Sequence, residues 1–169
     1  MKEIEIKILN IDVEEIRNKL LDLGAEKIFD GEVHALTYDF PEEKLENNDE
    51  FLRVRTVGDK TEFCFKGKKE DSQFKTREEI QVTTSDFNET CNILERLGLK
   101  KFHDKTKIRE SYKLGKVSFE IDTYPEFPTF LEIEAPTEEE VKEYVEKLGY
   151  TMEQTTNLGS YQLIEKYQK

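Results

Sequence analysis

Charged side chains recur at every second position in several segments of the chain. Acidic pairs occur in EIE (3–5), EID (120–122) and EIE (132–134), and basic pairs occur in LRVR (52–55) and KIR (107–109). Residues two apart on a strand point to the same face of a sheet, so each pair holds two like charges side by side. Carboxylates bind hard cations such as Mg²⁺ or Mn²⁺, while Arg and Lys bind phosphate oxygens. The two kinds of pair together predict a site for a polyphosphate with a bound divalent cation.

The segments that carry these pairs alternate between apolar and charged residues, which predicts strands over 3–9, 51–57, 61–67, 75–82, 105–114, 116–122 and 130–135. One face of these strands is apolar and is expected to pack against helices: Ile4, Ile6, Ile8, Leu52, Val54, Phe63, Phe65, Ile80, Val82, Ile108, Tyr112, Phe119, Ile121, Leu131 and Ile133. The other face is almost entirely charged: Glu3, Glu5, Lys7, Arg53, Arg55, Lys66, Lys75, Arg77, Glu79, Lys105, Lys107, Arg109, Glu120, Asp122, Glu132 and Glu134.

Three segments have helical periodicity and end in Leu-Gly. The first is capped by Asp12, the second follows Ser85 with Phe87, Cys91, Leu94 and Leu97 on one face, and the third begins with Thr137 and Glu140 in a possible capping box. No linker divides the chain, so the sequence predicts one α+β domain over residues 1–169.

The overall charge excludes several classes of function. A net charge of −12 argues against binding nucleic acid or an anionic membrane surface. The N-terminus MKEIEIK lacks the apolar run of a signal peptide, so a cytoplasmic location is expected. Cys64 and Cys91 lie in apolar-periodic segments without metal-ligand spacing and are interpreted as reduced packing residues.

Like charges held side by side repel unless opposite charge lies between them, so either the acidic strands neighbour the basic ones or ligands intervene. If the sheet curls into a barrel, its charged face lines a water-filled lumen. A polyphosphate with bound metal would satisfy both signs of charge there, and the absence of His and Cys from the set favours Mg²⁺ or Mn²⁺ over zinc.

These motifs resemble the CYTH superfamily, also called triphosphate tunnel metalloenzymes, which includes class IV adenylate cyclases and thiamine triphosphatases. EIEIK (3–7) fits the ExExK signature, and LRVR, FKG (65–67), TREEI (76–80), KIRESY (107–112), FEID (119–122) and FLEIE (130–134) follow in order. YDFP (38–41) before LRVR is most similar to the class IV cyclase (CyaB-like) subgroup, and SYQLI (160–164) to the family's C-terminal end.

The resemblance implies an eight-stranded antiparallel closed barrel with helices outside, holding a triphosphate and a divalent metal. It implies metal ligands at Glu3, Glu5, Glu120, Asp122, Glu132 and Glu134. It implies phosphate ligands at Lys7, Arg53, Arg55, Lys66, Arg77, Lys107 and Arg109, with Glu5, Lys7 and Glu134 as catalytic residues. Glu79, Lys75 and Lys105 are further possible members of the site. Pro128 and Thr129 stand where the subgroup commonly has Leu-Gly, which puts the geometry of that turn in question.

Two reactions share this constellation and differ in the nucleophile. Attack by water on the terminal phosphate makes a triphosphatase acting on tripolyphosphate, thiamine triphosphate or a nucleotide. Attack by a ribose 3′-hydroxyl on the α-phosphate of ATP gives cyclic AMP and pyrophosphate. A module that binds polyphosphate or nucleotide without chemistry, and a structural barrel with a wet lumen, are the alternatives. The protein is expected to act as a monomer or a homodimer.

Overall fold

The computed structural model of the chain describes residues 2–70 and 72–167, except for the side chains of Lys2 and Glu3. The long strands are β1 (Lys2–Leu9), β2 (Glu26–Asp39), β3 (Phe51–Val57), β4 (Lys60–Lys66), β5 (Lys75–Thr84), β6 (Lys100–Leu114), β7 (Val117–Thr123) and β8 (Phe130–Ala135). The helices are α1 (Val13–Asp22), α2 (Phe87–Arg96), α3 (Glu138–Lys147) and α4 (Ser160–Tyr167). Short 3-10 turns lie at Glu46–Asn48 and Met152–Gln154, and the two-residue strand β9 is Thr155–Thr156.

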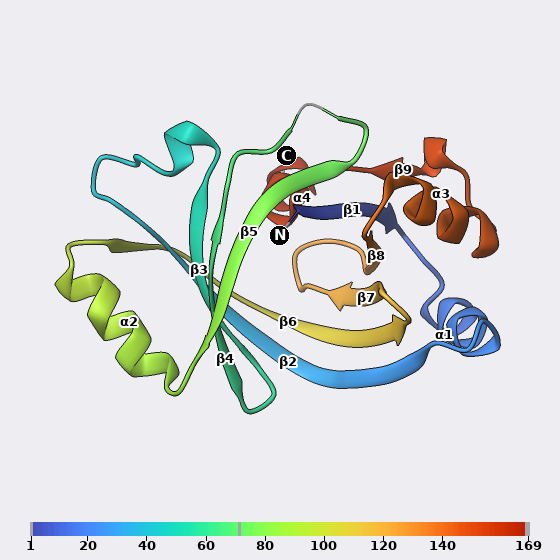
Figure 1. Cartoon of the computed structure of the whole chain (residues 1–169), viewed down its shortest axis with the longest axis horizontal. Helices are drawn as coiled ribbons and strands as arrows, with labels where there is room; N and C mark the ends of the chain where they lie inside the picture. Colours follow the sequence, from blue (N-terminus) through green and yellow to red (C-terminus); the bar gives the residue numbers. More distant parts are fainter. Residues whose placement is uncertain (1, 71, 168–169) are drawn as a thin grey trace. The chain divides into compact units, whose positions relative to one another are not determined.

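The eight long strands form a closed barrel. Their order is β5-β4-β3-β2-β6-β7-β8-β1, and a further pairing of β5 with β1 completes the ring, while β9 pairs with β1 (Figure 1). Every pairing whose register is described is antiparallel. The predicted fold class, a closed antiparallel barrel with helices, is therefore confirmed.

The strands are shared between two compact units. The first unit comprises residue 2 and residues 31–70 and 77–107, and the second comprises residues 3–30, 72–76 and 108–167. A single domain over 1–169 stays a prediction.

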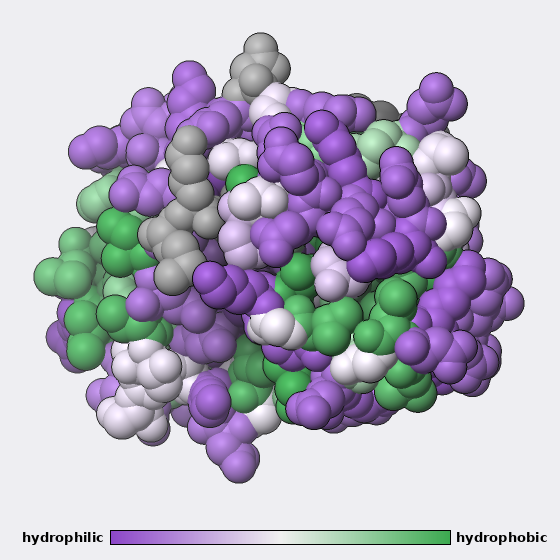
Figure 2. Space-filling model, turned by 45° about the vertical axis from the view of Figure 1, so that its right-hand side comes forward, coloured by the Kyte–Doolittle hydropathy of each residue, from purple (hydrophilic) through white to green (hydrophobic). Residues whose placement is uncertain are grey.

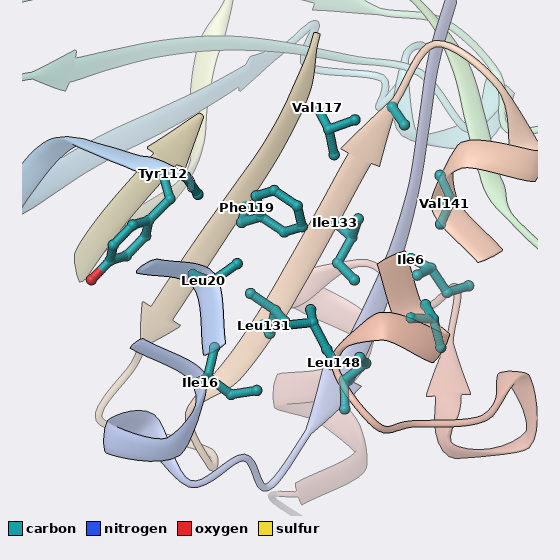
Figure 3. Close-up of a cluster of buried hydrophobic side chains, with 14 of the residues drawn as sticks. Ile6, Ile16, Leu20, Tyr112, Val117, Phe119, Leu131, Ile133, Val141 and Leu148 are labelled. Atoms are coloured by element: carbon teal, nitrogen blue, oxygen red, sulfur yellow. The ribbon is translucent and has the colours of Figure 1, made fainter. Parts of the chain in front are cut away.

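The second unit has a large apolar core on the outer face of β1, β7 and β8. Ile16 and Leu20 of α1, Val141 of α3 and Leu148 directly after α3 pack on strand residues that include Phe119, Leu131 and Ile133 (Figure 3). Asp12 caps α1 by accepting a hydrogen bond from the Glu15 amide at 3.0 Å, as predicted. Two helices therefore cover the apolar face in this unit.

The core of the first unit is smaller and rests on α2 alone. Its buried members are Leu36, Tyr38, Val54, Cys91, Leu94 and Leu99. Cys64 and Cys91 are buried free thiols, which confirms their interpretation as packing residues. The cap of α2 is Asp86, one residue after the predicted Ser85, and it accepts from the Glu89 amide at 2.8 Å.

Parts of the predicted apolar face are wrong. Ile80 and Val82 on β5 and Ile108 on β6 are exposed, as is Leu97 at the end of α2. Alternation fixes the face of a strand on which a side chain lies, but burial also needs an element that packs on that face. Figure 2 shows hydrophobic side chains reaching the surface among the hydrophilic ones.

One of the long strands, β2, was not predicted, nor was the two-residue strand β9. β2 runs for 14 residues, but its first half is largely exposed and its buried apolar side chains are confined to the second half, from Val33 onward. The apolar alternation that marks a half-buried strand is therefore present over only part of its length.

Pro128 and Thr129 lie in an aromatic segment that seats the C-terminal helix. The rings of Tyr124, Phe127 and Phe130 stack, and they pack with Leu163 and Ile164 of α4. Among residues 2–70 and 72–167, no helix is both long enough and apolar enough to cross a lipid bilayer.

Candidate functional site

The charged face predicted from alternation is withdrawn from solvent. Every member whose side chain is described is buried or half-buried, and the side chain of Glu3 lies outside the described residues. The charges fall into two groups, one in each unit. The acid-rich cluster of the second unit comprises Glu5, Lys7, Lys75, Arg109, Glu120, Asp122 and Glu132. The base-rich cluster of the first unit comprises Arg53, Arg55, Glu62, Lys66, Arg77 and Glu79.

Lys7 joins two carboxylates in the acid-rich cluster. In the β1–β8 pairing, Lys7 lies opposite Glu132 and Glu5 lies opposite Glu134. The Lys7 Nζ atom is 2.5 Å from Glu5 Oε1 and 2.6 Å from Glu132 Oε2, and the residue is 0% exposed. Lys75 Nζ contacts the same Glu5 Oε1 at 2.6 Å. Two ammonium groups therefore converge on Glu5.

Arg109 neutralises the other carboxylates of this cluster. It lies opposite Asp122 in the β6–β7 pairing and binds it through two parallel bonds, Nε to Oδ1 and Nη2 to Oδ2, both at 2.6 Å. Its guanidinium is also 3.6 Å from Glu120 Oε2 and 3.7 Å from Glu132 Oε1. Ser111 donates a hydrogen bond to Glu120. Four carboxylates thus share three cations.

Burial and pairing oppose each other in the pKa values of this cluster. Burial alone lowers the pKa of Lys7, but the charges of Glu132 and Glu5 outweigh it and raise that pKa above its ordinary value. Burial raises the pKa of Glu132, yet Lys7 and Arg109 hold it below its usual range. The pKa of Glu120 is raised, chiefly by burial. Lys7 and Glu132 are therefore ionised together at neutral pH.

The base-rich cluster is paired more loosely. Lys66 Nζ lies 2.9 Å from Glu79 Oε2, Arg53 reaches the same carboxylate at 4.0 Å, and Arg55 Nε lies 2.6 Å from Glu62 Oε2. Lys105 and Lys107, on β6 of this unit, are half-buried. Cations outnumber carboxylates here, the reverse of the acid-rich cluster.

Arg77 is bound by two loops. Its Nη1 donates to the backbone carbonyls of Asp49 at 2.5 Å and Gly67 at 2.8 Å, and its Nη2 lies 2.7 Å from Asp49 Oδ1. Burial raises the pKa of Asp49, but its bonds to Arg77 and to the Lys69 amide outweigh burial and lower that pKa. Arg77 was predicted to bind phosphate. In this structure its guanidinium binds the carboxylate of Asp49 instead.

The family profile described as the CYTH domain matches residues 1–160 of this chain. The chain belongs to the CYTH family. A protein of Methanocaldococcus jannaschii named "Putative adenylate cyclase" is 32% identical over 134 residues, which cover 79% of this chain and 77% of that one.

Solved structures of similar proteins reproduce the fold of this CYTH chain. A Pyrococcus horikoshii OT3 protein superposes with a TM-score of 0.81 and 25% identity, covering 95% of this chain and 98% of that one. A Hippeastrum protein, described as a "putative adenylyl cyclase" with a dominant triphosphatase activity, gives a TM-score of 0.67 and 13% identity, covering 97% of this chain and 95% of that one. The second likeness shows the fold alone.

The acid-rich cluster contains the type of donor atom that binds a divalent metal. They are carboxylate oxygens crowded on one buried face, which suits a hard cation such as Mg²⁺ or Mn²⁺. In the part of the chain that the structure describes, however, no three acidic, His or Cys side chains surround a common point in the way a metal ion requires. Lys7 and Arg109 instead occupy the space between the carboxylates.

Three members of these networks were not predicted from the sequence. Ser111 has the same strand parity as Lys107 and Arg109, and Glu62 lies opposite Arg55 in the β3–β4 hairpin. Parity could have found Ser111. Asp49 lies at the end of a loop without periodicity, so its contact with Arg77 left no signal in the sequence.

Proposed function

We propose that this CYTH protein is a divalent-metal-dependent enzyme, using Mg²⁺ or Mn²⁺, that acts on the phosphate chain of a triphosphate. The observation that carries the proposal is the buried Lys7 ammonium held between Glu5 and Glu132. Removing charges from water costs several kcal/mol per ion, and a paired cluster of this kind gives little net stability in return. The cost of burying these charges is better explained if the cluster binds a ligand, whose charged groups replace the carboxylates as partners of Lys7.

Substrate binding would exchange the ion pairs of the acid-rich cluster. Phosphate oxygens offer Lys7 and Arg109 new anionic partners, so these cations turn to the substrate and release the carboxylates they now hold. The released carboxylates would hold the metal, with Glu5 and Glu132 first because both now share Lys7. The remaining proposed ligands are Glu3, Glu120, Asp122 and Glu134.

The base-rich cluster would supply the other phosphate contacts. Arg53, Arg55, Lys66 and Lys107 bind phosphate oxygens in this proposal, with Lys75, Lys105 and Glu79 as auxiliary members. Arg77 would join them after leaving Asp49. A bound divalent cation would neutralise the phosphate chain and polarise the phosphorus that is attacked. The chain's own cations stabilise the negative charge that develops on the leaving group.

The nucleophile decides between two reactions. The name of the Methanocaldococcus jannaschii relative favours attack by the 3′-hydroxyl of ATP, which would yield cyclic AMP and pyrophosphate. The Hippeastrum description attaches triphosphate hydrolysis to the same fold, so hydrolysis by water is the second candidate.

Parallel incubations separate these reactions. ATP, tripolyphosphate and thiamine triphosphate are each incubated with Mg²⁺ or Mn²⁺, and the products are resolved by ion-exchange chromatography. Cyclic AMP with equimolar pyrophosphate identifies the cyclase, and orthophosphate identifies the triphosphatase. Saturable binding in calorimetry without any product would instead favour a binding module and contradict the enzyme.

Two variants test the residues. Glu5→Gln and Glu134→Gln should each reduce metal-dependent turnover by about a hundredfold or more, an effect typical of losing a group that stabilises the transition state. Glu139→Gln, on the exposed side of α3, is the matched control and should leave turnover unchanged. Full activity in both site variants would overturn the assignment.

A further inference from the structure

The charged face of the second unit continues beyond the acid-rich cluster along the β6–β7 hairpin. Ser111 of β6 lies opposite Glu120 of β7. Two residues further along on the same face, Lys113 lies opposite Ser118, and both are half-buried. Glu134 of β8 lies opposite Ser118 on its other side. A cation and a hydroxyl group therefore stand beside a carboxylate that is proposed to hold the metal.

Lys113 differs from the cations of the acid-rich cluster in its partners. Those three cations each lie 2.6 Å from a carboxylate oxygen: Lys7, Lys75 and Arg109. The Lys113 Nζ atom instead donates to two neutral oxygens, Ser118 Oγ at 2.8 Å and the Lys116 carbonyl at 3.2 Å. It makes no ion pair with any residue that the structure describes. Its charge is thus held in place by hydrogen bonds but is not neutralised.

Lys113 and Ser118 also have hydrogen-bond donors that the chain does not use. An ammonium group carries three N–H donors, and Lys113 uses two of them. The Ser118 hydroxyl accepts from Lys113, and its own O–H makes no hydrogen bond within residues 2–70 and 72–167. Ser111, by contrast, donates its O–H to Glu120. An anion could therefore bind to Lys113 and Ser118 without breaking any internal bond.

We propose that Lys113 and Ser118 form a further phosphate subsite, which binds an oxygen of the substrate's phosphate chain. The inference rests on the proposed function, since the ligand it names is the triphosphate substrate. A phosphate oxygen is an anionic acceptor for the third N–H of Lys113 and the O–H of Ser118, and hydrogen bonds between ions are the stronger kind. Lys113 and Glu134 flank the Ser118 hydroxyl, so the subsite lies next to a proposed metal ligand.

The competing explanation for Lys113 is purely structural. Its bond to the Lys116 carbonyl joins the two ends of the β6–β7 turn. If this were its only role, removing the ammonium would lower the free energy of unfolding and leave the affinity for phosphate chains unchanged. Binding and stability must therefore be measured separately.

Calorimetric titration of the full chain with Mg²⁺ and an imido analogue of tripolyphosphate, whose bridging nitrogens resist hydrolysis, measures the affinity. Lys113→Met should weaken binding about tenfold or more, and Ser118→Ala about threefold. Lys113→Arg keeps a cation and should recover most of the affinity that Lys113→Met loses. Lys116→Met is the matched control, because it removes the same charge from an exposed position of the same hairpin and should leave the affinity unchanged.

Chemical labelling of the wild-type protein tests the contact without any substitution. Lysine side chains are acetylated with and without the bound analogue, and the modified positions are identified by mass spectrometry. The analogue should protect Lys113, whereas Lys116 should react equally in both samples. This measurement also decides the question if Lys113→Met does not fold, which thermal unfolding of each variant will show.

Failure of the subsite can be distinguished from failure of the proposed function. A wild-type protein that binds the analogue but shows no protection of Lys113, or the same affinity in Lys113→Met, would overturn the subsite alone. An equal loss of affinity in Lys116→Met would do so too. If the wild type does not bind the analogue, the subsite is overturned, and if it also turns over no triphosphate, the proposed function fails with it.

Discussion

The two units of the barrel use the same strand alternation but bury their charges to different depths. The apolar core of the second unit has sixteen buried side chains under α1 and α3, against six under α2 in the first. Lys7, Glu5 and Asp122 above the larger core are almost fully buried, with Lys75, Glu120 and Glu132 around them at 13% to 15% exposure. In the first unit Lys66 and Arg77 are buried, whereas Arg53, Arg55 and Glu79 keep between 16% and 18% of their side chains exposed. A well-covered sheet can hold charges away from water only if those charges satisfy one another.

This difference separates two roles for charge. The acid-rich cluster is tightly paired, so its members are costly to remove one at a time. In the base-rich cluster Lys66 and Arg77 are also buried, but Arg53 and Arg55 keep part of their side chains exposed, so these two cations can change partners at a lower cost. Variants that delete one charge from each cluster test this contrast directly.

The largest effect is expected from Lys7→Met. The substitution removes the ammonium that Glu5 and Glu132 share and leaves two buried carboxylates facing each other. Deleting one partner of a buried charge network costs about 3–5 kcal/mol. Arg55→Met breaks the less deeply buried pair with Glu62 and should cost less than Lys7→Met. Urea unfolding measures both changes in the free energy of unfolding.

Adding Glu132→Gln to Lys7→Met supplies the control. It removes one of the two carboxylates that lose the Lys7 ammonium, so the double variant should be more stable than Lys7→Met alone. Equal losses in Lys7→Met and Arg55→Met would contradict the contrast in burial between the clusters.

The second effect concerns a buried carboxylate on the outer side of β6. Glu110 is bound by Arg17 of α1 at 3.0 Å, by Lys27 at 2.9 Å and by the Tyr112 hydroxyl at 3.0 Å. The hydrogen bond from Arg17 is the main cause that lowers the pKa of Glu110 from 4.5 to about 2. This network fastens α1 to the sheet of the second unit through charged groups, whereas α2 is joined to β2 by a hydrogen bond from the Tyr38 hydroxyl to Glu95 at 3.3 Å.

The lowered pKa fixes the sign of the pH dependence. A carboxyl group whose pKa is lower in the folded state stabilises the fold above its unfolded pKa and loses that contribution as the pH falls. Wild-type stability should therefore decline between pH 4.5 and about 2 through this group. The shift corresponds to about 3 kcal/mol at most. The Glu110→Gln variant should be less stable than wild type at pH 7, and its stability should decline less as the pH falls from 4.5 to about 2. Thermal unfolding across this pH range measures both effects. A variant with the same dependence of stability on pH as wild type would contradict the role of Glu110.

The third effect concerns the hydrogen bonds that hold the loop after β2 in the first unit, whose apolar core is small. Asp39 is buried, and its carboxylate accepts hydrogen bonds from the amides of Phe40 at 2.6 Å, Leu45 at 2.9 Å and Glu46 at 2.8 Å. Asp39→Ala leaves these amides without their acceptor and should cost about 2 kcal/mol. Hydrogen exchange should rise selectively over residues 40–49 if the effect is local. A uniform rise across both units would contradict a local role.

The sequence predicted what depends on local alternation. Parity along β1 places Glu5 and Lys7 on one face, and motif order led to the closed barrel. It did not predict that Lys7 lies opposite Glu132, because strand register depends on pairing between distant segments. It also placed Ile80 and Val82 in the core, because they alternate with Arg77 and Glu79 along their own strand, although no alternation pattern can reveal whether a helix covers the strand.

The smallest effect compares the helix caps of the two units. Asp12 and Asp86 each accept a hydrogen bond from the amide three residues later, at 3.0 Å and 2.8 Å. Replacing such a cap by Ala costs about 1 kcal/mol, whatever the size of the core beneath the helix. If the chain unfolds as one domain over residues 1–169, Asp12→Ala and Asp86→Ala should shift a single calorimetric transition by similar amounts. Two transitions, each shifted by only one of the variants, would show instead that each unit unfolds by itself. The unit with the smaller core should then unfold at the lower temperature.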